Sequence, residues 1–188
     1  MRLIVTGFEP FGGADVNASW EAVRRLDGVE KLLLPVSFAG ATGKIRGLVA
    51  GGPDAVICVG EAGGRSAICV ERVAVNLMDA RIPDNDGAQP LDEPVAPGGP
   101  AARFSTLPTR DIVERLREAG IDAQLSYTAG TYVCNATFYA LMEAVARSGR
   151  PIPAGFIHVP ARDMPTETIA EGLRIAVREV EKGLTGSR

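Results

Sequence analysis

The sequence contains few of the residues on which metal centres and disulfide frameworks depend. It has a single histidine, His158, and three cysteines, Cys58, Cys69 and Cys134, which lack CxxC spacing. A zinc site built on two or three imidazoles is therefore excluded, and any reaction that needs an imidazole must use His158. The odd number of cysteines favours free thiols in a reducing, cytoplasmic location. We expect no metal and no cofactor.

Long apolar runs and an excess of positive charge are also missing. No run approaches the roughly 18 apolar residues that span a bilayer, and the apolar start of the chain meets Glu9 too early for a signal peptide. The formal net charge is −3, so no overall positive field attracts nucleic acid. We therefore expect neither a membrane nor a nucleic-acid partner. The length and the 46% of hydrophobic residues predict one globular domain over residues 1–188.

Strand and helix signals alternate along the chain. Short apolar runs predict buried strands, and apolar stripes at helical spacing predict helices. The strands are expected at 2–6, 31–36, 54–60, 67–77, 122–127 and 155–160, and the helices near 17–26, 40–50, 108–120, 135–149 and 166–182. This alternation predicts an α/β fold, an α/β/α sandwich with a mostly parallel, twisted central sheet.

Residues 79–100 interrupt the alternation. They include five prolines and three glycines. An irregular segment of this length inside a compact domain is uncommon and tends to be functional. Its many polar residues predict an ordered, hydrogen-bonded loop near a site, and a solvated surface loop is the alternative.

Three residues form a candidate nucleophilic site. Cys134 lies at the first turn of a predicted helix, where the helix N-terminus lowers a thiol pKa and offers N–H groups to an oxyanion. His158 lies at a strand end, which in a parallel sheet borders the ligand crevice. Glu71 lies on the apolar face of an alternating strand, where a carboxylate needs a partner. It can orient the histidine, or form a structural pair with Arg65 or Arg81. Each of the three residues, taken alone, is more often structural.

Two glycine-rich loops follow strands. GFEPFGG (7–13) and GEAGGR (60–65) both lack the P-loop and dinucleotide-binding patterns. The two phenylalanines of the first loop suit an apolar ligand better than a phosphate. The second loop is able to bind an anion through backbone amides and Arg65, although Glu61 weakens that signal. A tight turn at the sheet edge is the structural alternative for both loops.

Five stretches occur in order along nearly the whole chain: TGFEPFGG (6–13), GEAGGR (60–65), ERVAVNLMDARIPDNDGAQP (71–90), SYTAGTYVCN (126–135) and GFIHVP (155–160). Together they resemble the pyroglutamyl peptidase I (pyrrolidone carboxyl peptidase) family. The resemblance implies a cytoplasmic cysteine exopeptidase that removes an N-terminal pyroglutamyl (5-oxoproline) residue from peptides. It also implies an α/β/α sandwich and a homo-oligomer, a tetramer or a dimer.

The resemblance also assigns roles to individual residues. It puts the nucleophile on Cys134, the histidine on His158 and the glutamate on Glu71. The substrate-binding residues that it implies are Phe8, Phe11, Asn17, Glu61, Arg81, Ile82, Tyr132 and Val133. The chain departs from the family at Glu61, where an uncharged residue is usual, in the segment between the first helix and Pro35, which is shorter, and after Pro160. The shortening after Pro160 affects the outer wall of the site and subunit contacts.

The leading interpretation is hydrolysis of the pyroglutamyl–peptide bond. Cys134 attacks the 5-oxoproline carbonyl, His158 acts as base and then as acid, and Glu71 orients the imidazole. One alternative is a phosphorylase-like or nucleotide-binding α/β/α protein that uses the GEAGGR loop. Another is a binding protein that keeps the lactam pocket without turnover, and the presence of all three candidate catalytic residues argues against it.

Overall fold

The computed structural model of the chain describes residues 1–186, in which strands and helices alternate. The helices are α1 (Ala18–Val23), α2 (Phe38–Ala50), α3 (Thr109–Glu118), α4 (Val133–Ser148) and α5 (Thr166–Gly186). The strands are β1 (Leu3–Phe8), β2 (Glu30–Leu34), β3 (Ala55–Ala62), β4 (Ile68–Glu71), β5 (Val73–Val75), β6 (Ala102–Phe104), β7 (Ala123–Ser126) and β8 (Ala154–Pro160). The predicted alternation is confirmed, with most boundaries within a few residues of those expected.

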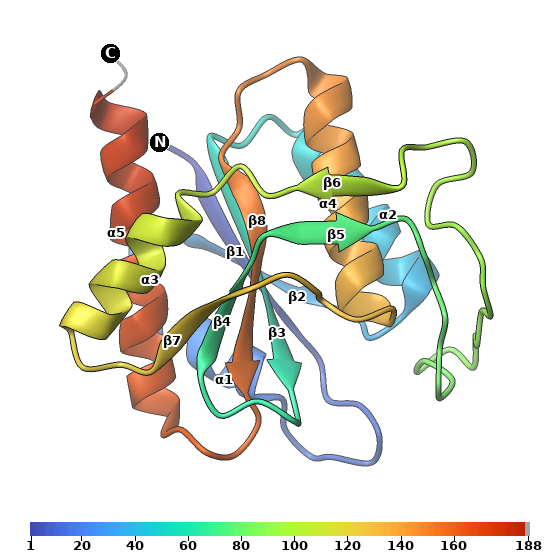
Figure 1. Cartoon of the computed structure of the whole chain (residues 1–188), viewed down its shortest axis with the longest axis horizontal. Coiled ribbons are helices and arrows are strands. Elements are labelled where there is room, and N and C mark those ends of the chain that lie inside the picture. Colours follow the sequence, from blue (N-terminus) through green and yellow to red (C-terminus); the bar gives the residue numbers. More distant parts are fainter. Residues whose placement is uncertain (187–188) are drawn as a thin grey trace.

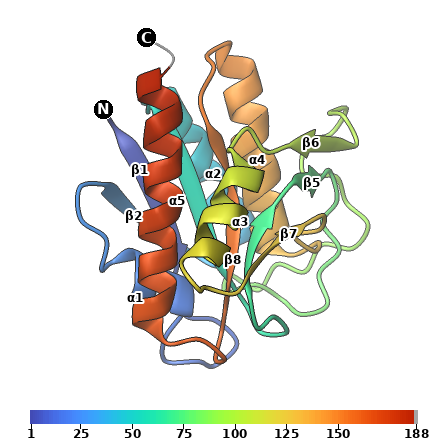
Figure 2. The ribbon, with the colours of Figure 1, turned by 60° about the vertical axis from the view of Figure 1, so that its left-hand side comes forward.

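The central sheet has six strands in the order β2-β1-β3-β8-β4-β7. β2, β1, β3 and β8 are parallel, whereas β4 runs antiparallel to β8, and β7 is parallel to β4. Helices α2 and α4 cover one face of the sheet, and α1, α3 and α5 cover the other (Figures 1 and 2). The predicted α/β/α sandwich with a mostly parallel sheet is therefore confirmed. No helix within residues 1–186 is long and apolar enough to cross a membrane.

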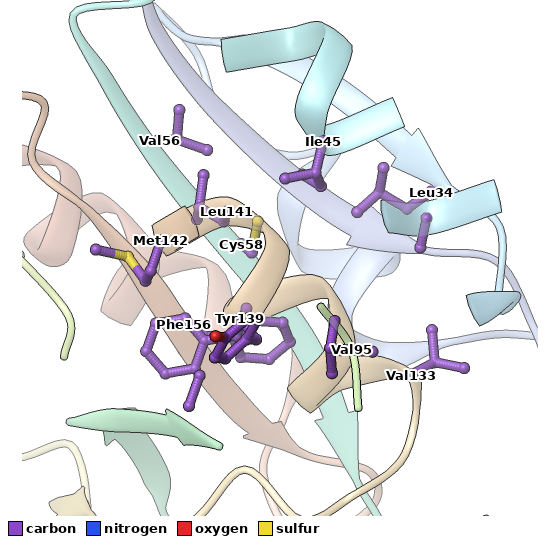
Figure 3. Packing of buried hydrophobic residues seen from close by; sticks show 14 of the residues in the cluster. Leu34, Ile45, Val56, Cys58, Val95, Val133, Tyr139, Leu141, Met142 and Phe156 are labelled. Atoms are coloured by element: carbon purple, nitrogen blue, oxygen red, sulfur yellow. The ribbon is translucent and has the colours of Figure 1, made fainter. Parts of the chain in front are cut away.

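The layer between the sheet and helices α2 and α4 contains the larger aromatic residues of the core. Phe138, Tyr139 and Leu141 of α4 are fully buried and pack against Phe156 of β8. They belong to one cluster with Ile45 of α2, and Figure 3 shows Tyr139, Leu141 and Phe156 on the side of the sheet on which Ile45 lies. α4 is buried over most of its surface because β5 and β6 cover the side that faces away from α2. This packing fixes the start of α4 over the sheet.

The strand predicted at 67–77 is divided in two by the structure. The break lies at Arg72, whose N–H donates to the Ser126 carbonyl and whose own carbonyl accepts from the N–H of Ser105. β4 belongs to the central sheet, whereas β5 pairs antiparallel with β6 in a separate two-stranded sheet. β6 was not predicted because three residues, two of them exposed, carry no periodic signal.

Residues 79–100 form the ordered loop that the sequence predicted. Asp84 is buried, and its Oδ1 accepts from the N–H groups of Asp86 and Ala88 while its Oδ2 accepts from that of Phe38 at the start of α2. Asn85 donates from Nδ2 to Glu9 Oε1 at 2.9 Å and to the Pro10 carbonyl at 3.0 Å. These bonds fasten the loop to the glycine-rich loop after β1. The loop is therefore ordered and hydrogen-bonded, as predicted, although most of its residues are exposed at the surface.

Candidate active site

A cavity of about 190 Å³ lies at the carboxyl ends of β1, β3 and β8. Eight of the predicted site residues line it: Phe8, Phe11, Asn17, Glu61, Tyr132, Val133, Cys134 and His158. Val36 and Ala129, which were not predicted from the sequence, line it as well. Both are small apolar residues without chemistry of their own, and the only signal was their position at the end of a predicted strand or just after one. The cavity brings the predicted nucleophile and the predicted base to one wall.

The other three predicted site residues do not line the cavity. Glu71 is fully buried behind His158. Arg81 and Ile82 lie on the 79–100 loop, where Arg81 is exposed and Ile82 is 37% exposed. Tyr132 donates its hydroxyl to the Pro83 carbonyl at 2.9 Å, which holds this part of the loop beside the cavity. The roles of Arg81 and Ile82 in binding stay predictions.

Cys134 is the second residue of α4, at the helix start that the sequence predicted. The N–H groups of a first helical turn have no intrahelical acceptor and are available to an anion. A Cβ added to Gly60 would come within 2.8 Å of Cys134 Sγ, so the sulfur lies directly over β3. Because Gly60 and His158 are paired in the parallel register, the thiol and the imidazole are on the same side of the sheet and next to each other.

The electrostatic setting of Cys134 differs from the expected one. Burial raises the pKa of its thiol to about 12, and the carboxylates of Glu71 and Glu61 act in the same direction, while Arg65 acts against them. The helix N-terminus alone predicts a lower thiol pKa. The apolar walls and the two carboxylates oppose that effect. A thiol with this pKa is protonated at neutral pH and needs a base.

His158 is positioned to be that base. Its Nδ1 lies 2.8 Å from Oε1 of Glu71, and both side chains are buried. A carboxylate oxygen only accepts, so Nδ1 carries the proton and Nε2 remains to accept another. The antiparallel pairing of Cys69 with His158 places Glu71, two residues further along β4, on the same face as the imidazole. The ring of Phe156 packs against the imidazole with its centroid 4.8 Å away.

Arg65 provides the second contact of Glu71. Its Nη1 donates to the same Oε1 at 2.7 Å. Both alternatives left open for Glu71 are therefore realised, an interaction with the histidine and a pair with Arg65. Glu61 Oε2 accepts the N–H of Ala18 at 2.6 Å. The cation of the GEAGGR loop is thus engaged inside the protein and an acid faces the cavity, which argues against a phosphate or nucleotide site there.

A larger cavity, of about 560 Å³, lies beside α2 and α4, away from these residues. Its charged side chains pair with one another: Glu143 accepts from Arg147 at 3.0 Å and lies 3.9 Å from Arg46. None of the predicted site residues lines it. The candidate active site is therefore the smaller cavity at the sheet edge.

Comparison with known proteins identifies the family of the chain. Residues 1–182 match the family model described as pyroglutamyl peptidase. The pyrrolidone-carboxylate peptidase of Thermococcus kodakarensis is 50% identical, with 98% of each chain covered. The crystal structure of pyroglutamyl peptidase I from Bacillus amyloliquefaciens is 43% identical with a TM-score of 0.92, covering 95% of this chain and 94% of that one. A mutant pyrrolidone carboxyl peptidase from Pyrococcus furiosus is 39% identical with a TM-score of 0.92, covering 98% and 100%. The chain therefore belongs to the pyroglutamyl peptidase family of enzymes.

Proposed function

We propose that the protein hydrolyses the amide bond after an N-terminal pyroglutamyl residue of peptides, with Cys134 as nucleophile, His158 as general base and acid, and Glu71 as the group that orients the imidazole. The observation that carries the proposal is the 2.8 Å contact of His158 Nδ1 with Glu71, because it directs Nε2 away from the carboxylate, while the imidazole shares the cavity wall with the Cys134 thiol. The family to which the chain belongs supports the choice of substrate.

The first step is acylation of the thiol. His158 Nε2 takes the proton of Cys134 as the sulfur attacks the carbonyl carbon of the 5-oxoproline, so a C–S bond forms and the carbonyl π electrons move to oxygen. The N–H groups at the start of α4 (Val133–Ser148), which have no intrahelical acceptor, hold that oxyanion in the proposed mechanism. A base is required here because burial keeps the pKa of Cys134 high, at about 12.

The second half returns the enzyme to its starting state. The carbonyl re-forms, the C–N bond breaks, and His158 gives its proton to the leaving amine of the shortened peptide. Water then attacks the thioester carbonyl while His158 accepts its proton, and collapse of this intermediate breaks the C–S bond and returns that proton to sulfur. Free 5-oxoproline is released. Glu71 stabilises the imidazolium in each half without changing its own protonation state.

The cavity suits a small, flat, uncharged ring. Its volume of about 190 Å³ is below the roughly 300–1,000 Å³ of sites for drug-sized ligands, so one small residue fits and the rest of a peptide lies outside. Phe8 is buried in its wall, and the Phe11 ring lies 6.4 Å from that of Tyr132. Asn17 is engaged in the loop itself, since Nδ2 donates to the Glu9 carbonyl and Oδ1 accepts from Ser19. The lactam N–H and C=O therefore meet backbone groups of the surrounding loops.

The test is release of amine from a pyroglutamyl arylamide. We expect the native protein to cleave it and iodoacetamide to abolish cleavage. Cys134→Ser should be inactive, whereas the matched variant Cys58→Ser, altered at a buried thiol that does not line the cavity, should retain activity. No cleavage by the native protein would contradict the proposed reaction, and an active Cys134→Ser protein would contradict the proposed nucleophile.

We further propose that residues 1–188 act as one catalytic domain. The cytoplasmic location and the homo-oligomeric assembly, a tetramer or a dimer, stay predictions. Sedimentation of the native protein tests the assembly.

A further inference from the structure

Arg65 contacts the proposed catalytic residues, yet no step of the proposed mechanism uses it. It lies on the loop between β3 and β4, and its side chain is 23% exposed while that of Glu71 is fully buried. Its Nη1 donates to Glu71 Oε1 at 2.7 Å and to Ser126 Oγ at 3.1 Å, and its Nη2 donates to the Thr128 carbonyl at 2.7 Å. One guanidinium therefore connects the β3–β4 loop, the buried carboxylate and the turn that leads to Cys134.

Glu71 depends on a single oxygen for its polar contacts. Oε1 accepts from both Arg65 and His158, whereas Oε2 has no hydrogen-bond partner among residues 1–186. A buried carboxylate without a compensating charge is costly, and an imidazole N–H alone supplies none. Arg65 supplies that charge, and its planar fork fixes the rotation of the carboxylate by binding Glu71 and Thr128 together.

We propose, building on the proposed function, that Arg65 is a positioning residue of the active site: it holds the Glu71 carboxylate by its Oε1 and aims that oxygen at Nδ1 of His158. The imidazole then presents Nε2 to Cys134. Arg65 itself does not touch the substrate, because it does not line the cavity. Its contribution reaches the reaction through the orientation of the imidazole and through the balance of charge around it.

The charges around His158 give the proposal a pH signature. The titratable and charged groups on the elements packed against it are Glu71 and Cys69 of β4, Cys58 and Glu61 of β3, Cys134 of α4, Tyr132 before α4, and Arg65. Without the guanidinium, Arg65 no longer compensates the negative charge of Glu71. That charge then stabilises the protonated form of His158 more than it does in the native protein. Loss of the guanidinium also removes the charge that lowers the pKa of Cys134. The first effect moves the acidic limb of the pH–rate profile to higher pH, because only the neutral imidazole accepts the thiol proton.

The experiment compares Arg65→Gln and Arg65→Lys with Arg72→Gln. Arg72 is the matched control, because it follows Glu71 directly but donates to Thr109 Oγ1 away from the site. We expect Arg65→Gln to lose about 10- to 100-fold in kcat on a pyroglutamyl arylamide, the range of a hydrogen bond to a charged group, with little change in KM. Its acidic limb should move to higher pH. Arg72→Gln should keep both the native kcat and the native limb.

Arg65→Lys keeps the charge, and therefore tests the proposal even if Arg65→Gln fails to fold. Lysine lacks the fork that reaches Glu71 and Thr128 at once, so we expect a kcat between those of the native and the Arg65→Gln proteins. A folded Arg65→Gln protein with the native kcat and limb would overturn the proposal, as would a native kcat in Arg65→Lys. Failure of the proposed function is a separate result, namely no cleavage by the native protein or cleavage by Cys134→Ser.

Discussion

Replacing Gly60 with alanine would put a methyl group into the wall of the active site. The added Cβ would lie 2.7 Å from Phe156 Cζ, 2.8 Å from Cys134 Sγ and 2.9 Å from Phe156 Cε1. Favourable contacts between carbon atoms lie at about 3.5–4.0 Å, so the neighbours must move by about 1 Å. Gly60 is also the register partner of His158. The substitution therefore acts on the nucleophile and on the base together.

The ring of Phe156 has little room to move. It is fully buried, and its centroid lies 5.9 Å from that of Phe138 and 6.3 Å from that of Phe8. Overpacking of this kind costs about 1–3 kcal/mol of stability. The partly exposed Cys134 yields more easily, and a misplacement of a reacting group by about 1 Å costs on the order of 100-fold in rate. The fall in the activity of Gly60→Ala should therefore be larger than its fall in stability alone would cause.

The measurement pairs kcat/KM on a pyroglutamyl arylamide with urea unfolding. Gly63→Ala is the control, since Gly63 lies just after the end of β3 and a Cβ there meets nothing within 4 Å. We expect Gly60→Ala to lose about 100-fold in kcat/KM while still folding, and Gly63→Ala to match the native protein in both assays. Native kcat/KM in Gly60→Ala would refute the placement of the Cys134 sulfur over β3.

Three further predictions concern residues around the site. Burial raises the pKa of Cys58 to about 12, so the unfolded chain releases this proton near pH 9 while the folded chain keeps it. The free energy of unfolding should then fall as the pH rises from about 9 to 12, by up to about 1.4 kcal/mol per pH unit, and urea titrations of Cys58→Ala should show a shallower fall. Asn85→Ala removes the bonds that fasten the 79–100 loop to Glu9 and Pro10, so steady-state kinetics should show KM raised about 5-fold with kcat nearly unchanged. The native protein and Glu61→Gln should both prefer the pyroglutamyl amide to the glutaminyl amide, because an open-chain ammonium loses several kcal/mol of hydration in this cavity; comparable cleavage of the two amides would contradict recognition of the lactam.

The sequence predicted the site better than it predicted the path of the chain that builds it. Period-two spacing identified Glu71 as a buried carboxylate that needs a partner, and the structure supplies one at 2.8 Å. The direction of β4 was not predictable from the alternation. A crossover helix enforces parallel strands, but β4 is preceded by a short loop after β3 and followed by the β5–β6 pair. The antiparallel pairing of β4 with β8 nevertheless brings Glu71 to His158.

The start of α4 and the state of its thiol show a second limit of the sequence. The predicted helix began at Asn135, whereas α4 begins at Val133, because Tyr132 at the N-cap makes no side-chain capping bond and so leaves no capping signal. The pKa of Cys134 depends on how far the apolar walls exclude water and on two carboxylates distant in sequence. Neither the exclusion of water nor the approach of these two carboxylates is predictable from a local sequence pattern. A prediction from the helix N-terminus alone therefore had the wrong direction.

The two alternatives for Glu71 are linked by electrostatics. If the Glu71 carboxylate contacted His158 alone, it would be a buried charge with one hydrogen bond. If it contacted Arg65 alone, Nδ1 of His158 would have no acceptor. Sharing Oε1 between them balances the charge before any proton moves. The imidazolium then forms only as the sulfur attacks. At that moment the oxygen of the substrate carbonyl takes up the negative charge beside the N–H groups of α4. The raised pKa of Cys134 is consistent with that order of events, in which attack on the carbonyl and transfer of the proton occur together.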